Sequence, residues 1–240
     1  MSAAFPSRAA HRLAGLLALL PLALWIGTGL LFHLKPGWDE AYEPLAAPPP
    51  GPLPWERVVF SPAALKARGL LDAGPVVLAA HPAGLVAYFG RRDGRPAAAD
   101  GTSGDAIPPA SEETARTYAA AAVAASRHAR SYGAILSTAP TAHRSALTGA
   151  DDPAFLFRTS GGKRVVVDRV TGEVSQDGTL NDRIDLLYRV HYLQWTPWKP
   201  ANAVLVLAAS VLVLLLAATG LRLSRASPPG PAGGTPPRAT

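Results

Sequence analysis

The sequence predicts an α+β fold in which two membrane-spanning helices flank a domain of ordinary mixed polarity. Leu13–Leu34 and Ala201–Leu221 contain no Asp, Glu, Lys or Arg, and about 20 consecutive apolar residues are enough for a helix to cross a bilayer. The residues between them, 35–200, are too polar for lipid and contain two similar patterns of short strands. We therefore expect a globular domain that is held to a membrane at both ends.

These patterns divide the chain into segments of different character. We expect a cytoplasmic N-terminus at 1–12, a transmembrane helix at 13–34, an aromatic and proline-rich linker at 35–54, repeat units at 55–110 and 111–180, a juxtamembrane segment at 181–200, a second transmembrane helix at 201–221 and a disordered cytoplasmic tail at 222–240. Within the linker, Ala46–Pro54 is typical of a polyproline spacer. The first apolar stretch is longer than the core of a signal peptide, which has about 7–15 residues, and this favours an uncleaved anchor.

The distribution of charge predicts the orientation. All 17 acidic residues lie within 35–200, although the formal net charge is +6 and the isoelectric point is about 10.0. Unpaired arginines flank the two apolar stretches on their other sides: Arg8, Arg12, Arg222, Arg225 and Arg238. Because positive residues beside membrane helices stay in the cytoplasm, both termini are expected inside and the domain outside. The basic charge thus indicates topology, and no nucleic-acid partner is expected.

Composition narrows the chemistry and the source. The chain contains no cysteine, so disulfides, Cys–zinc sites and thiol nucleophiles are excluded. Frequent Ala, Pro, Gly and Arg favour a bacterial source rich in G and C, which would place the protein in the inner membrane with its domain in the periplasm. Motifs for nucleophilic hydrolysis, zinc hydrolysis, phosphate loops and dinucleotide binding are not found in the sequence. The sequence therefore favours a role that is not enzymatic for this chain alone, with no catalytic residues and no metal site.

The domain contains an internal repeat. Tyr88-Phe89, Gly94, Asp100 and Ser103-Gly104-Asp105 recur at a constant offset as Leu156-Phe157, Gly162, Asp168 and Thr171-Gly172-Glu173. Each copy predicts two short strands joined by a glycine turn. Ser61-Pro62 and Ser111 precede the two copies and are typical helix starts. The predicted order is helix–strand–strand, twice, and the strands could form one antiparallel sheet or two.

These motifs resemble a known family. The segment Val167–Val174 (VDRVTGEV) resembles the end of a PepSY domain, His11 to Gly29 resembles the first helix of PepSY-associated membrane proteins, and Leu187 to Leu221 resembles their returning segment. The resemblance implies a membrane protein with PepSY-like units. Some members of the family are implicated in siderophore-iron reduction with haem held by membrane histidines. Others carry PepSY modules thought to restrain peptidases.

Three histidines lie at the predicted membrane boundaries. His33 ends the first apolar stretch, His191 precedes the second, and His11 is at the inner end of the first. Because haem iron takes axial imidazoles from facing helices, His33 and His191 could share one haem in the outer leaflet, and His11 could bind a second haem with another chain. The alternative is that these side chains hydrogen-bond lipid headgroups or nearby carbonyl groups. Two groups of acidic residues near the same boundary favour a solvated rim over a metal site: Asp39, Glu40 and Glu43, and Asp182 and Asp185.

The sequence thus leaves three functions open. The preferred prediction is a binding or regulatory module, in contact with the bilayer and with a protein partner or a second copy of the chain. The first alternative is a haem-binding electron-transfer subunit linked to iron reduction, with His33, His191 and His11 as cofactor-binding residues. The second alternative is a structural subunit whose helices stabilise a larger membrane complex.

Overall fold

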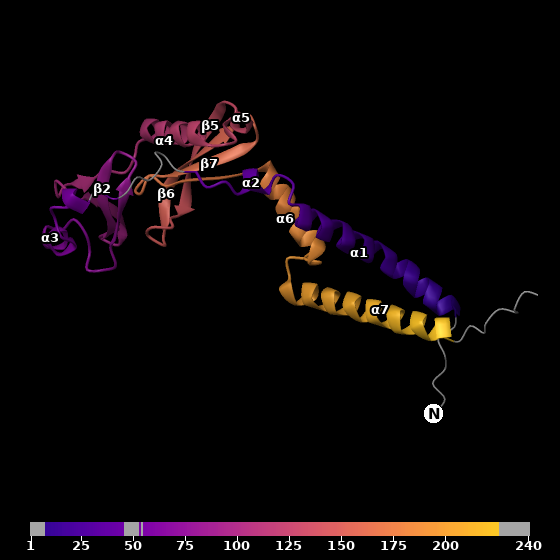
Figure 1. Cartoon of the computed structure of the whole chain (residues 1–240). Helices are drawn as coiled ribbons and strands as arrows, with labels where there is room; N and C mark the ends of the chain where they lie inside the picture. Colours follow the sequence, from indigo (N-terminus) through magenta and orange to yellow (C-terminus); the bar gives the residue numbers. More distant parts are fainter. Residues whose placement is uncertain (1–7, 46–52, 54, 226–240) are drawn as a thin grey trace, which may run out of the picture. The chain divides into compact units, whose positions relative to one another are not determined.

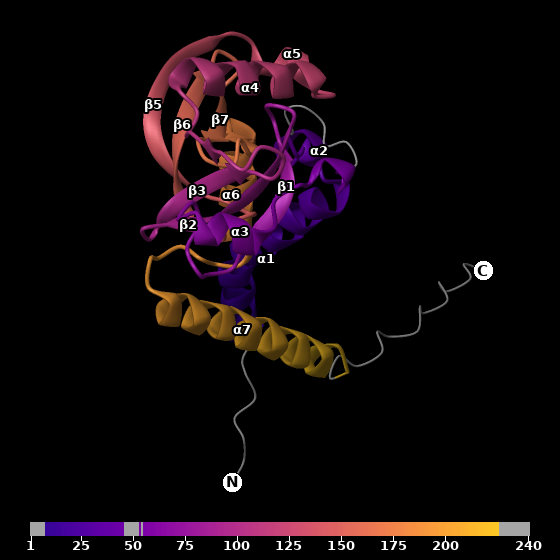
Figure 2. The same ribbon diagram turned by 90° about the vertical axis from the view of Figure 1, so that its left-hand side faces the viewer.

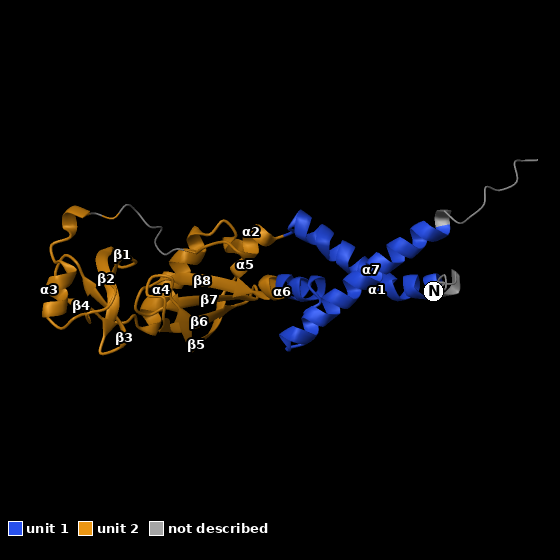
Figure 3. Ribbon diagram, turned by 90° about the horizontal axis from the view of Figure 1, so that it is seen from below, with its two compact units in different colours: residues 1–36, 183–240 blue, residues 37–182 orange. Residues whose placement is uncertain are grey.

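The computed structural model describes residues 8–45, 53 and 55–225, and the chain divides into two compact units (Figures 1 and 3). The helical unit comprises Met1–Pro36 and Arg183–Thr240, and the sheet unit comprises Gly37–Asp182. The predicted polyproline spacer, apart from Leu53, and the predicted tail from residue 226 onward lie outside the described residues.

Two long apolar helices form most of the helical unit. Helix α1 (Arg8–Leu34) and helix α7 (Lys199–Arg225) pack against and cross one another (Figure 3). The spans His11–Leu34 and Lys199–Leu223 are long and apolar enough to cross a membrane. Most of their leucine side chains are exposed, as expected of helices whose solvent is lipid rather than water. Both predicted membrane helices are therefore present, with bounds that differ by a few residues. Helix α6 (Thr179–His191) begins in the sheet unit and ends in the helical unit.

The sheet unit contains two antiparallel sheets of four strands each, which answers the question of one sheet or two. The first sheet has the order β1-β2-β3-β4 and the second has the order β5-β6-β7-β8. The strands are β1 (Val77–His81), β2 (Leu85–Arg92), β3 (Arg95–Asp100), β4 (Ala106–Ile107), β5 (Ile135–Arg144), β6 (Asp151–Thr159), β7 (Lys163–Asp168) and β8 (Val174–Gly178).

The two predicted hairpins are confirmed as the central strand pairs. β2 pairs with β3 and β6 pairs with β7. The turns contain Gly94 at φ 71° and Gly162 at φ 77°, a conformation that costs glycine little because it has no β carbon. Each repeat nevertheless has four strands rather than the expected two, because one strand is added at each side of the hairpin. The longest of these added edge strands, β5, carries Pro140, which an edge strand tolerates because one side of its backbone makes no ladder hydrogen bonds.

The two helices predicted to begin after Ser61 and Ser111 are confirmed. The Ser61 hydroxyl accepts a hydrogen bond from the Ala64 N–H at the start of α3 (Pro62–Ala67), and Ser111 accepts from the Thr114 N–H at the start of α4 (Glu112–Ala125). Such caps satisfy N–H groups that lack a partner within the helix. The remaining short elements are α2 (Trp38–Ala41), η1 (Trp55–Arg57) and α5 (Ala129–Tyr132).

Helix α4 covers one face of the second sheet (Figure 2). Its small, fully buried alanines lie against Phe157, Val165 and Val167 of β6 and β7. A separate apolar cluster joins the repeats: Val170, which follows β7, is buried with Ala87, Phe89 and Ala98 of the first sheet. The two sheets therefore belong to one packed unit, as their shared cluster requires.

Candidate functional site

The imidazole of His191 is held at the end of α6 by a threonine of α1. Its Nδ1 atom lies 2.9 Å from Thr28 Oγ1. The Thr28 hydroxyl donates its hydrogen to the Leu24 carbonyl at 2.7 Å, one turn earlier in α1. A hydroxyl group has a single hydrogen, so a Thr28 hydroxyl that donates to Leu24 accepts from His191. This arrangement favours the tautomer of His191 with its proton on Nδ1 and its lone pair on Nε2.

Aromatic rings surround the same imidazole. Phe32 and Tyr192 meet it edge-on, with ring centroids 4.9 and 5.0 Å away, and the Trp25 ring lies at 6.0 Å. Gly29 also faces the ring, since a β carbon there would lie 3.7 Å from His191 Cε1. These contacts fix the orientation of the imidazole within an apolar setting.

The same arrangement recurs at the other end of the helix pair. His11 Nδ1 lies 2.8 Å from Thr219 Oγ1, and the Thr219 hydroxyl donates to the Leu215 carbonyl at 2.8 Å. The same geometry favours the Nδ1–H tautomer of His11. A β carbon on Gly220 would lie 3.4 Å from His11 Cε1. At each end of the helix pair, a histidine thus packs against a Thr-Gly dipeptide of another helix. The partners are 163 residues apart for His191 and 208 residues apart for His11.

The structure does not bring His33 beside His191. His33 is exposed and lies five residues after Thr28. At about 100° per residue, this places it well to the side of the α1 face formed by Thr28 and Phe32. His11 and His191 are also far apart, since 17 residues of helix separate His11 from Thr28, or about 25 Å. The three candidate histidines therefore occupy three separate positions in the helical unit.

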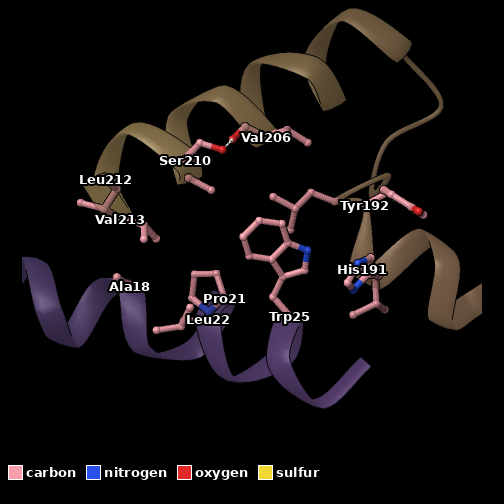
Figure 4. Close-up of a pocket in the computed structure, with 13 residues that line it drawn as sticks. Ala18, Pro21, Leu22, Trp25, His191, Tyr192, Val206, Ser210, Leu212 and Val213 are labelled. Carbon is pink, nitrogen blue, oxygen red and sulfur yellow. Dashed lines mark hydrogen bonds between the residues drawn. The ribbon is translucent and has the colours of Figure 1, made fainter. Parts of the chain in front are cut away.

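A small cavity adjoins His191 between α1, α7 and the segment that follows α6 (Figure 4). Its volume is about 110 Å³, and its walls include Pro21, Trp25, Val206 and Val213. The nearby Ser210 hydroxyl donates to the Val206 carbonyl of its own helix. Polar groups that line the cavity thus include the imidazole of His191, the indole N–H of Trp25 and the hydroxyl of Tyr192.

A second polar cluster, in the sheet unit, joins α2 to the second sheet. Lys163 of β7 makes an ion pair with Glu40, and the Gln176 and Asn181 side-chain amides donate to the Ala41 carbonyl. The acidic groups expected to form a solvated rim thus include a carboxylate paired with a buried lysine. Sequence reasoning missed this cluster, because nothing in the spacing of Glu40 and Lys163 indicates that they meet.

A comparison with protein-family models identifies the family of this chain. The model of the PepSY-associated TM region family matches residues 8–228, nearly the whole chain. The chain belongs to this family. No curated protein and no solved structure matches it. Together with its two membrane-length helices, membership of the PepSY-associated TM region family makes this chain a membrane protein with a PepSY-associated domain.

The geometry of this family member can be tested against haem. Neutral imidazoles with Nδ1–H bonded to an oxygen and Nε2 free have the chemistry of axial ligands. Each end of the helix pair offers one such ligand, His11 or His191. The cavity beside His191 is smaller than ligand pockets, which begin at about 300 Å³. The described residues thus place one such histidine at each end of the helix pair, and the cavity beside His191 is too small to enclose a macrocycle.

Two aspartates that end the hairpins accept hydrogen bonds from the turns that follow them. Asp100 accepts a hydrogen bond from the Thr102 N–H, and Asp168 accepts from the Val170 and Thr171 N–H groups. These contacts close the turns that follow β3 and β7, as side-chain oxygens of Asp commonly do.

Proposed function

We propose that this member of the PepSY-associated TM region family is a bacterial inner-membrane protein that presents its sheet unit in the periplasm as a binding or regulatory module. The bound partner is a protein within a larger membrane assembly. The orientation is supported by the arginines outside the apolar helices, because positive residues beside a membrane favour the cytoplasm.

The observation that carries the proposal is the free edge of the second sheet. Strand β5 is ten residues long, is an edge strand, and has seven exposed residues. An exposed edge offers N–H and C=O groups to which an extended peptide can add as a further strand. Leu136 is 69% exposed on this strand and provides an apolar contact for such a peptide.

Pro140 identifies which backbone groups face outward. Proline has no N–H and is tolerated where that position points away from the neighbouring strand. Residues two positions away share this orientation, so Thr138 and Ala142 have N–H groups at the open edge. Because Ala142 is exposed, its substitution tests the edge without removing a core side chain.

The test is co-purification of the full chain from bacterial membranes with the Ala142→Pro variant. Ala142→Pro removes one outward N–H and should release the partner, whereas the matched control Ala142→Ser keeps the N–H and should retain it. If the partner stays bound to Ala142→Pro and also to a variant with a disrupted second sheet, such as Phe157→Asp, the membrane helices are the docking element. That result would favour the structural-subunit alternative.

The orientation has its own test, since the chain contains no cysteine. Single cysteines at Ser2 and Arg95 can be treated with a thiol reagent that does not cross the membrane. In intact spheroplasts, Arg95→Cys should be labelled and Ser2→Cys should not. The reverse pattern would place the domain in the cytoplasm.

A second candidate function is a haem-binding electron-transfer subunit linked to the reduction of ferric siderophores. It is favoured by the assigned protonation of His191 and His11, which leaves Nε2 of each available for iron. The second axial ligand would come from another chain at each end, or from His33 at the outer end.

The test of this second function is the absorption spectrum of protein purified in detergent after expression with added haem. A Soret band that is lost in His191→Ala and kept in His33→Ala supports ligation by His191 and a second chain. Loss in both variants supports the His33/His191 pair. A wild-type protein without a Soret band eliminates this function and leaves the binding module untouched.

A further inference from the structure

Two fully buried carboxyl groups lie side by side in the second repeat. Asp152 of β6 and Asp168 of β7 are both 0% exposed. Asp152 Oδ2 accepts a hydrogen bond from the Thr148 hydroxyl at 2.9 Å, and Asp168 Oδ1 accepts from two backbone N–H groups at 2.8 Å each. The other oxygen of each group, Asp152 Oδ1 and Asp168 Oδ2, has no hydrogen-bond partner among the described residues.

The charges around these groups do not neutralise two carboxylates. Asp168 pairs with Ala154, two residues after Asp152, so the two side chains lie on the same face of the sheet as diagonal neighbours. The positive charge of Arg91, on β2, interacts electrostatically with Asp152. His143 of β5 interacts in the same way with Asp168 and lies opposite Asp152 in the strand register. Arg91 is exposed and also donates to the Gly94 carbonyl. Burial raises the pKa of both carboxyl groups, and the negative charge of Asp168 raises the pKa of Asp152 further.

We propose that Asp152 and Asp168 share one proton and that this proton closes a pH-dependent lock between the two repeats. A single proton satisfies both remaining oxygens, since one becomes a donor and the other accepts. A hard cation such as Ca²⁺ needs about six to eight oxygen ligands, and this pair offers two uncommitted ones. Among the described residues there is also no group of three or more His, Cys, Asp or Glu placed to hold a metal ion.

The shared proton affects the contact between the two repeats, because each aspartate accepts hydrogen bonds from one of the loops that make this contact. Asp152 holds Thr148, next to Leu147, and Asp168 holds the backbone of Val170. Leu147 and Val170 pack into the apolar cluster that contains Phe89 of the first sheet. Loss of the shared proton would leave two adjacent buried charges beneath these loops, and their repulsion would loosen the joint.

The first repeat serves as an internal comparison. Asp100 occupies the place of Asp168, and its Oδ2 atom accepts from the Ser103 hydroxyl. Asp100 pairs with Ala87 as Asp168 pairs with Ala154, so Leu85 stands where Asp152 does in the second repeat. The first repeat therefore satisfies its aspartate with a hydroxyl group and has no second carboxyl group, so the pair is particular to the second repeat.

The test measures the distance between the repeats in the full chain, reconstituted in lipid nanodiscs. Because the chain lacks cysteine, Arg95→Cys in the first repeat and Ala142→Cys in the second can carry spin labels for pulsed EPR. The distance distribution should be narrow at about pH 5 and about twofold broader at about pH 9, a range that covers buried carboxyl groups. With Asp152→Asn, whose amide always donates, it should stay narrow at both values.

Asp168→Asn provides a second route to the same result if Asp152→Asn does not fold, because its amide oxygen can still accept from the turn. A wild-type distribution that does not change with pH would overturn the proposal, as would Asp152→Asn with the full pH response. If EDTA broadens the wild-type distribution at about pH 5 and CaCl₂ restores it, a cation rather than a proton holds the pair, and the proposal is wrong.

Discussion

Lys163 Nζ lies 3.2 Å from Glu40 Oε1 and also donates to the Glu40 carbonyl at 3.3 Å. The lysine belongs to β7 and its side chain is 4% exposed, whereas Glu40 belongs to α2. The Tyr132 ring lies 5.5 Å from the same ammonium group. A buried cation needs such partners, so this ion pair holds α2 and the second sheet in one arrangement.

We expect Lys163→Met to destabilise the sheet unit by about 1–3 kcal/mol, because it removes the buried partner of the Glu40 carboxylate. The Glu40 carbonyl keeps its hydrogen bond from the Gln176 amide. The measurement is thermal unfolding in detergent micelles, followed by circular dichroism. The double variant Lys163→Met/Glu40→Met removes both charges and should recover part of the loss. If the double variant is less stable than the single one by the full cost of a second independent substitution, the two residues do not act as a pair.

The protonation assigned to His191 depends on the Thr28 hydroxyl. Thr28→Val removes the acceptor with little change of shape, so the preference for Nδ1–H should fall by about fivefold, the equivalent of a hydrogen bond worth about 1 kcal/mol. Nitrogen-15 NMR of labelled histidine measures the two tautomers. Thr219→Val is the matched control and should change His11 while leaving His191 as it was. Equal effects of both substitutions on His191 would contradict the assignment.

The hairpins and membrane helices were predictable because their signals are local. The apolar runs define α1 and α7. Gly94 and Gly162, each with a positive φ, mark the two hairpin turns. The edge strands were not predictable. β5 mixes Ser, Thr, Ala and Pro140, and its exposed residues show no alternation of apolar and polar side chains. Such a strand forms because the neighbouring β6 supplies its hydrogen bonds, which is a property of the fold and not of the segment.

The candidate site was predictable only in its residue types. His11 and His191 were singled out by their place beside the apolar runs, but their threonine partners lie 208 and 163 residues away. Helical periodicity gives the face of a residue and not the element that faces it. The pairing of His33 with His191 was based on nearness to the membrane boundary and stays a prediction, and helical periodicity places His33 about 140° around α1 from Thr28.

Two glycines of the sheet unit should respond very differently to substitution. A β carbon on Gly161 would lie 1.8 Å from the Ser131 carbonyl oxygen, which is backbone and cannot move aside. Gly94 has a φ of +71° and no atom within 4 Å of such a carbon. Gly94→Ala should therefore cost about 1–2 kcal/mol, from backbone conformation alone, and Gly161→Ala more than about 4 kcal/mol. Melting temperatures of the two variants test this, and equal costs would be inconsistent with the close approach at Gly161.

The stability of the sheet unit at acid pH should depend on Glu43. Burial of this carboxylate opposes its charge, but hydrogen bonds from the Ser126 hydroxyl and the Arg127 N–H outweigh burial, and the pKa of Glu43 falls below its ordinary value of 4.5. The folded protein therefore binds this proton less readily than the unfolded chain does. The resulting stability is present above pH 4.5 and is lost as the pH falls through the lowered pKa.

Glu43→Gln should lower the unfolding free energy by about 1.5 kcal/mol at neutral pH, the value of hydrogen bonds to a charged group, and the difference from wild type should shrink toward about pH 3. Urea unfolding in detergent micelles at several pH values gives this difference. Asp152 and Asp168 have raised pKa values, so the stability that they contribute falls as the pH rises. Both residues are present in wild type and in Glu43→Gln, so their contribution cancels in the difference between the two proteins. Glu112→Gln on α4, where the carboxylate is 52% exposed, is the control and should change stability by no more than about 0.5 kcal/mol at any pH. A Glu43→Gln difference that does not vary with pH would show that the carboxylate stabilises the fold by packing rather than by its charge.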